Sequence, residues 1–150
     1  MAYQVVKHKQ FVEEFELVDE NGEIKKTIHV KLDADDIVVK LNRKYAELTK
    51  ALAISTEMKR KAQSNEEVSD AFEKLGNAAI DLFEAVFGEE DTKFIVEFYE
   101  GRYIEMVKEV TPFITKCVIP RCVEIKKENQ KNILKDYNRK QSRTLFGKKK

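Results

Sequence analysis

The chain has 150 residues, a formal net charge of +1 and no run of about 18 apolar residues, which excludes a membrane-spanning helix. A length of about 100–150 residues is typical of one domain. Charged residues make up 37% of the chain, while five glycines and two prolines leave little loop, so the composition favours long amphipathic helices with charged outer faces.

The charge is unevenly distributed along the chain. Residues 124–150 hold ten Lys or Arg and three Asp or Glu, a net charge of +7, which leaves −6 for the other 123 residues. The sequence therefore predicts an acidic body with a basic C-terminal arm.

The first predicted element is a β-hairpin over residues 11–32. Apolar residues alternate on both sides of the run DENG at residues 19–22, which is a strong turn signal. We therefore expect strands near residues 11–18 and 23–32. An isolated hairpin is marginal in water, so the helices that follow are the expected cover for its apolar face. The alternating residues are Phe15, Leu17, Ile28, Val30 and Leu32.

Two helices are expected next. From about residue 36 the apolar period changes from two to about 3.6, and either Asp33 or Asp35 can cap the start. Ser64 or Asn65 can cap the second helix, and Gly88 is well placed as its left-handed C-terminal residue. The expected stripes are Ile37, Leu41, Tyr45, Leu48 and Leu52 on the first helix, and Val68, Phe72, Leu75, Ala79, Leu82 and Val86 on the second.

Gly76 lies inside the second predicted helix, where it costs about 1 kcal/mol relative to alanine. A glycine at such a position allows another backbone to approach closely. We therefore expect a close backbone contact at this point of the helix.

The segment over residues 87–114 is dense in acidic and aromatic residues. Asp91 is the expected N-cap of a short helix that ends at Gly101, with Glu89 and Glu90 beside its positive end. A further helix is expected to start at Tyr103. The pair Thr111-Pro112 then either kinks one long helix or caps a new one, because proline lacks a backbone donor and clashes with the preceding turn.

Large apolar residues become sparse beyond Pro120, which predicts a polar helix to about residue 139. We expect one globular domain over residues 1–139, with the hairpin at 11–32 and the helices over 36–139. Residues 140–150 are the expected basic, disordered tail. The predicted fold class is α+β, mostly α, with the N-terminal hairpin packed on a bundle of four to five helices.

Few residues are candidates for chemistry. The acidic run at residues 89–91 has no His or Cys near it in the sequence, and acids at a helix start explain it. His8 and His29 fall in the β region, with His29 expected to point away from the apolar face. Cys117 and Cys122 are five apart, which matches neither a zinc pair nor a redox pair, so free, buried thiols are expected.

No nucleophile elbow, dinucleotide-binding loop or phosphate-binding loop is present in the sequence. We therefore predict no catalytic, cofactor-binding or metal-binding residue and no cofactor, and we expect recognition through an exposed helix face or groove. The aromatic residues of the middle of the chain are expected in the core, where they join helices. They are Phe72, Phe83, Phe87, Phe94, Phe98, Tyr99 and Tyr103.

The basic arm is the one segment for which nucleic-acid binding is considered. Its Lys and Arg residues can neutralise phosphates, and Tyr137 or Phe146 can stack on bases. Against this, the body is acidic and no known RNA- or DNA-binding module is present. A solvated tail and a tail that docks on an acidic protein partner are the other interpretations.

The sequence resembles the small tail assembly chaperones of long-tailed, siphovirus-type phages with Gram-positive hosts. The resemblance lies in the hairpin FELVDENGEIKKTIHVKLDADD, in the central segment over residues 71–114, and in the charged C-terminal end. It covers most of the chain. This family is defined more by size and helical content than by invariant motifs.

The resemblance implies a non-enzymatic chaperone. In this family the protein binds the tape measure protein, a very long helical polypeptide, and keeps it soluble while tail tube subunits assemble around it. The implied partners are the tape measure protein and the tail tube protein. Self-association is also expected, because monomers rarely expose large apolar patches. We expect no membrane contact, and we favour a protein partner over nucleic acid. The implied place of action is the host cytoplasm, with the chaperone absent from the mature virion.

Two other functions stay open at this point. The first is a small nucleic-acid-binding accessory protein that acts through its basic C-terminal arm. The second, a small helical enzyme, has no recognisable site in the sequence.

Overall fold

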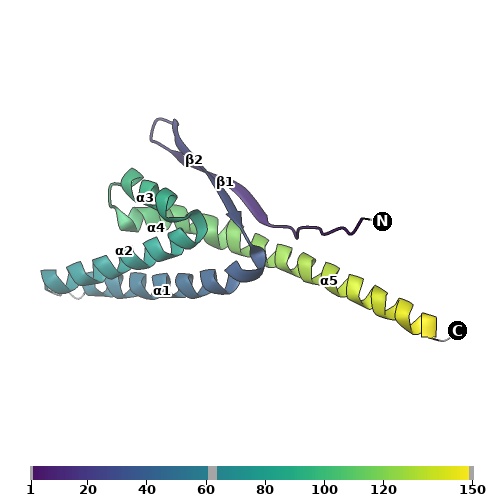
Figure 1. Cartoon of the computed structure of the whole chain (residues 1–150). Helices are drawn as coiled ribbons and strands as arrows, with labels where there is room; N and C mark the ends of the chain where they lie inside the picture. Colours follow the sequence, from purple (N-terminus) through teal and green to yellow (C-terminus); the bar gives the residue numbers. More distant parts are fainter. Residues whose placement is uncertain (1, 61–63, 149–150) are drawn as a thin grey trace.

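The structure, a computed structural model, describes residues 2–60 and 64–148, with side chains described over 2–58 and 64–134. Two strands precede a set of helices, and the hairpin lies over the helical bundle (Figure 1). The prediction of a mostly α, α+β fold with an N-terminal hairpin packed on helices is confirmed. The elements are β1 (Phe11–Val18), β2 (Ile24–Leu32), α1 (Ala34–Arg60), α2 (Asn65–Phe87), α3 (Glu89–Phe98), α4 (Tyr103–Pro112), the π-helix η1 (Phe113–Val118) and α5 (Ile119–Lys148).

The hairpin forms where the alternation predicts it. The strands β1 and β2 are antiparallel, with Phe15 opposite Ile28. The side chains of this pair face the helices. In the turn, the Asp19 carboxylate accepts hydrogen bonds from the backbone N–H of Asn21 and of Glu23, both at 2.9 Å. The bond from Glu23 is the main reason why the pKa of Asp19 is lowered.

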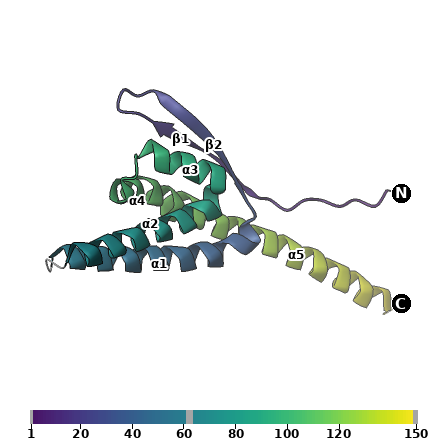
Figure 2. The ribbon, with the colours of Figure 1, turned by 60° about the vertical axis from the view of Figure 1, so that its left-hand side comes forward.

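The helices α1 and α2 form an antiparallel pair, and α3 and α4 lie on the side of this pair that faces the turn end of the hairpin (Figures 1 and 2). Asp33 is the cap of α1, because its carboxylate accepts the N–H of Asp35 at 3.1 Å. Ser64 caps α2 by accepting the N–H of Glu67 at 3.3 Å. The predicted stripe on α1 fails at Tyr45, which is 37% exposed, whereas Leu41 and Leu48 of the same stripe are buried.

The helix α3 starts two residues before the predicted cap. Gly88 takes a φ of +86°, as predicted for the end of α2, and α3 begins directly at Glu89. The prediction that Asp91 is the N-cap is therefore wrong, because this residue lies in the first turn. Its carboxylate instead forms an ion pair at 3.3 Å with Lys26 of β2, which joins α3 to the hairpin.

Of the two alternatives at Thr111-Pro112, the structure has the continuous helix. The helix α4 runs through Pro112 into η1 and then into α5. Proline cannot donate a backbone hydrogen bond and its ring crowds the preceding turn. The wider π-helical turn that follows Pro112 accommodates this change without ending the helix.

The helix α5 is longer than the sequence predicts. It ends at Lys148 and not near residue 139, and its C-terminal half projects away from the bundle (Figures 1 and 2). Sparse apolar residues led to the shorter prediction, but good helix formers such as Lys, Gln and Arg continue the helix without a packed face. The division into a domain over 1–139 and a tail over 140–150 stays a prediction.

Three phenylalanine rings join the hairpin to the helices. The centroid of the Phe15 ring on β1 lies 5.0 Å from the ring centroid of Phe87 on α2 and 4.8 Å from that of Phe113 in η1. The rings of Phe87 and Phe113 lie 6.0 Å apart. Phe83 and Phe87 are buried, and the other aromatic residues of the predicted stripe are partly buried.

Gly76 is placed against a side chain and not against another backbone, so that detail of the prediction is wrong. A Cβ at Gly76 would lie 2.9 Å from the ring of Tyr103 at the start of α4. The missing side chain therefore makes room for an aromatic ring, which brings α4 close to α2.

We predict that Phe15→Ala lowers the free energy of unfolding by about 2–3 kcal/mol, because the hairpin then loses both of its ring contacts. Urea denaturation followed by circular dichroism measures this change. The control is Val12→Ala on the exposed face of the same strand, which should change stability by less than about 0.5 kcal/mol. Equal effects of the two substitutions would contradict the role given to Phe15.

We also predict that Gly76→Ala destabilises the chain by about 1 kcal/mol, because overpacking against Tyr103 outweighs the gain of about 1 kcal/mol in helix propensity. In a Tyr103→Ala background the same substitution should stabilise the chain by about 1 kcal/mol. A double-mutant cycle of urea midpoints measures the coupling. Additive effects would show that the ring does not set the requirement for glycine.

Candidate functional site

The helix α5 has a packed half and a free half. Cys122, Ile125 and Asn129 are buried on the face that packs against the rest of the chain. Every described side chain from residue 130 to residue 134 is exposed. We call residues 130–148 the free half of α5.

The buried face of α5 continues into the free half as an exposed apolar face. Ile133 follows Asn129 by four residues and Ile125 by eight, so these three positions share one side of the helix. Ile133 is 49% exposed and its neighbour Leu134 is 60% exposed. An apolar face of this kind, left open on a helix, is typical of a protein-binding surface.

Basic residues accompany this apolar face along α5. Lys126 and Lys127 precede the free half and Lys131 lies within it, all in the region of net charge +7. Only one of the described acids in this part of α5, Glu128, forms an ion pair across elements, with Lys9 at 3.4 Å. The free half of α5 therefore suits a partner that has both apolar and acidic side chains.

The N-terminal segment, residues 2–10, also projects from the bundle. It has no helix or strand, all of its residues are exposed, and it leaves the body on the same side as α5 (Figures 1 and 2). Its apolar side chains Tyr3, Val5 and Val6 are 93%, 85% and 80% exposed. The Asn129 side-chain amide donates to the backbone carbonyl of Lys9 at 3.0 Å, which fixes the base of the segment on α5.

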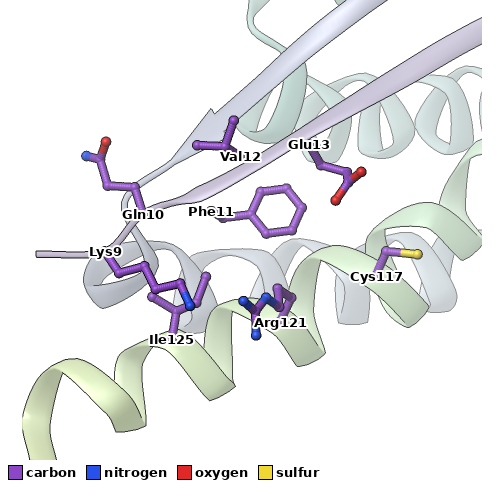
Figure 3. A pocket seen from close by; sticks show the side chains of 8 residues that line it. All are labelled: Lys9, Gln10, Phe11, Val12, Glu13, Cys117, Arg121 and Ile125. Atoms are coloured by element: carbon purple, nitrogen blue, oxygen red, sulfur yellow. The ribbon is translucent and has the colours of Figure 1, made fainter.

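A groove of about 440 Å³ lies at the base of this segment, between the start of β1 and the helix below it (Figure 3). Its floor is apolar because Phe11 and Ile125 are buried there. Its rim is polar, with Glu13 on the strand side and Arg121 on the helix side. The lining residues are Lys9, Gln10, Phe11, Val12, Glu13, Cys117, Arg121 and Ile125.

The two cysteines have different environments. Cys122 is buried, as predicted, and this burial raises the pKa of its thiol to about 11. Cys117 is exposed at the edge of the groove, so the prediction that it is buried is wrong. Cys117 directly precedes Val118 in η1, so its side chain points to a different side of the helix from the buried Ile114 and Val118.

A second hollow, of about 480 Å³, lies between the hairpin turn and the α3–α4 connection and is rich in acids. Arg102 forms ion pairs there with Glu100 at 3.2 Å and with Glu105 at 3.4 Å. Partial burial, then the charges of Glu109 and Glu105, raise the pKa of Tyr99 in its wall. The hollow contributes to the acidic character of the body.

The residues that the sequence offered for chemistry are not brought together. His8 is exposed, and His29 points away from the core, as predicted, with its Nδ1 3.6 Å from a carboxylate oxygen of Glu14. Glu89 and Glu90 lie in the first turn of α3, as expected for acids at a helix start. Within residues 2–60 and 64–148, no group of His, Cys, Asp and Glu is arranged to hold a metal ion.

The described part of the chain has no helix that could span a membrane. Tyr137 and Phe146, which were considered for base stacking, lie outside the residues whose side chains the structure describes.

The absence of a catalytic, cofactor-binding or metal-binding residue stays a prediction from the sequence.

Sequence reasoning missed the N-terminal segment and the apolar face of the free half. The spacing of Ile125 and Ile133 was a usable signal, because eight residues are close to two helical turns. It was overlooked because polar residues dominate this part of the chain. Comparisons of the chain with protein-family models, curated proteins and solved structures gave no match.

We predict that Cys117 reacts with a thiol reagent at pH 8 and that Cys122 does not, because Cys122 is buried with a pKa of about 11. The Cys122→Ser variant should keep the reaction of the native chain, and Cys117→Ser should lose it until denaturant is added. A colorimetric thiol assay measures both. Fast labelling of the Cys117→Ser variant without denaturant would contradict the packing described for α5.

Proposed function

We propose that this chain is a non-enzymatic phage tail assembly chaperone that binds the tape measure protein during tail morphogenesis. The free half of α5 is the surface that we assign to this binding. On this proposal the protein acts in the host cytoplasm and is absent from the mature virion.

The observation that carries the proposal is the exposed apolar face of the free half of α5. A long helical polypeptide that is held soluble must cover its own apolar face, and a second amphipathic helix is a suitable cover. Ile133 and Leu134 supply apolar contacts, while the surrounding lysines steer an acidic partner. The free half also stands away from the body, so a long partner can lie along it (Figure 1).

The main alternative is nucleic-acid binding by the same basic helix. The positive charge of residues 124–150 supports it, because lysines bind phosphates without any special geometry. However, phosphate contacts do not require the apolar pair at residues 133 and 134. Protein binding accounts for both the charge and the apolar face, so we favour it.

The test is co-expression with the very long helical reading frame expected beside this gene. We predict that the long polypeptide is soluble with the native chain and is lost to the pellet with Ile133→Asp/Leu134→Asp. In binding assays, loss of two apolar contacts of about 1 kcal/mol each should weaken affinity by at least about tenfold. Pelleting and binding isotherms measure the two effects.

A matched control is Val39→Asp, which changes an exposed apolar residue of α1, outside the free half of α5. It should leave solubility and affinity unchanged, and circular dichroism should show equal helix content in all variants. Binding should weaken much less between about 0.05 and 0.2 M salt than phosphate binding does, because salt screens the attraction by the lysines but not the apolar contacts. Steep loss with salt and tight binding to duplex DNA would favour the nucleic-acid alternative instead.

A further inference from the structure

The strand β1 has an edge without a strand partner. The described sheet has two strands, and β1 pairs with β2 along one side. Its other side lies toward the groove above α5 (Figure 3). Unpaired backbone N–H and C=O groups on such an edge form a template for another extended chain.

The N-terminal segment has the composition of a strand without a partner. It runs directly into β1, so its residues would continue the alternation of that strand once the segment is extended as a strand. Tyr3 and Val5 fall on the same phase as Phe15 and Leu17, whose side chains face the core. At about 3.3 Å per residue, residues 2–10 extend about 30 Å, which is enough to follow the whole of β1.

The charges of these two elements are complementary. The N-terminal segment carries Lys7, His8 and Lys9 and no acid. The strand β1 carries Glu13, Glu14 and Glu16 and no base, and all three are exposed. Each chain thus contains both a basic extended segment and an acidic open edge.

We propose that two copies of this chain pair through their N-terminal segments, which add as antiparallel strands to the open edge of β1 in the other copy. The joined sheet has the order β2, β1, β1 of the partner subunit, β2 of the partner subunit. The contact is twofold symmetric, so it closes with two copies and satisfies both open edges at once.

The alternation and the charges favour one register, in which the twofold axis passes through Gln10. Lys7 of one copy then lies opposite Glu13 in the partner, and Val5 lies opposite Phe15. Tyr3 lies opposite Leu17. A shift by one residue would move Tyr3 and Val5 to the solvent face, so the core face selects this register.

We favour a second copy of this chain at the open edge of β1, and not the helical partner proposed for the free half of α5. Strand addition requires an extended chain with free backbone groups, which a helix does not offer. The complementary charges also belong to one chain, so every copy brings both halves of the contact. This inference does not rest on the proposed function, because it involves the hairpin side and not the free half of α5.

The first test measures mass by sedimentation equilibrium of the whole chain. We expect twice the 17.5 kDa of one chain, and a chain without residues 2–9 should sediment at the mass of one copy with unchanged circular dichroism. A whole chain that stays monomeric at about 100 μM, well above typical dimer dissociation constants, would overturn the proposal. A dimer that survives the deletion would overturn it as well.

The second test uses charge. Lys7→Glu and Glu13→Lys should each raise the dimer dissociation constant about tenfold, because each places like charges opposite each other twice in the dimer. The double variant Lys7→Glu/Glu13→Lys should restore the native value. Lys40→Glu on α1 is the matched control and should have no effect. Failure of the double variant to restore dimerisation would overturn the register.

The third test uses a disulfide at the axis, in a background with Cys117→Ser and Cys122→Ser. Gln10→Cys should form a disulfide between two copies on mild oxidation, because directly opposite residues in antiparallel strands lie within disulfide reach. Val12→Cys should not, since this residue faces His8 of the partner subunit and not its own copy. Efficient cross-linking of Val12→Cys with none at Gln10→Cys would overturn this register.

Discussion

The contact of three rings, Phe15, Phe87 and Phe113, determines where the other parts of this molecule lie. It joins a strand, a long helix and the π-helical turn at a single point of the core. A two-stranded hairpin has little stability of its own, so its position depends on what its apolar face meets. With the hairpin held on the helices, β1 lies beside α5, and the N-terminal segment leaves the body beside Asn129 of that helix. The ion pair between Lys26 and Asp91 holds the other end of the hairpin on α3.

The continuous helix through Pro112 has an equally direct consequence. If the chain had ended a helix there, the apolar residues after Pro112 would have needed a new turn to reach the core. Instead η1 carries Phe113, Ile114 and Val118 along the bundle, and α5 inherits the same direction. The helix therefore passes Asn129, the last buried residue among the side chains described through residue 134, and projects away from the bundle (Figure 2). Along this continuous helix Cys117 is exposed in η1, whereas Cys122 on α5 is buried.

The features that local patterns control were predictable from the sequence, and those that depend on distant contacts were not. The hairpin register follows from the alternation around the turn at residues 19–22, and Ser64 and Gly88 bound α2 as capping rules require. By contrast, Asp91 had the chemistry of a cap, but Gly88 allowed the helix to start earlier. The neighbour of Gly76 was a ring and not a backbone, which no local pattern encodes. The face of α5 carrying Ile133 was hidden because its charges were more numerous than its apolar residues.

The two projecting elements suit two different kinds of contact, and charge is the reason. Two copies of the free half of α5 would bring lysines together, so pairing of this helix with itself is opposed by like charges. In the proposed function, its exposed Ile133 and Leu134 contact a different, acidic partner. At the hairpin two copies bring opposite charges together, because the basic N-terminal segment and the acidic strand β1 belong to the same chain. Self-association is then favoured at the sheet edge and disfavoured along α5. A dimer built through the sheet would leave both copies of α5 open, so that one assembly could hold a long helical polypeptide at two places.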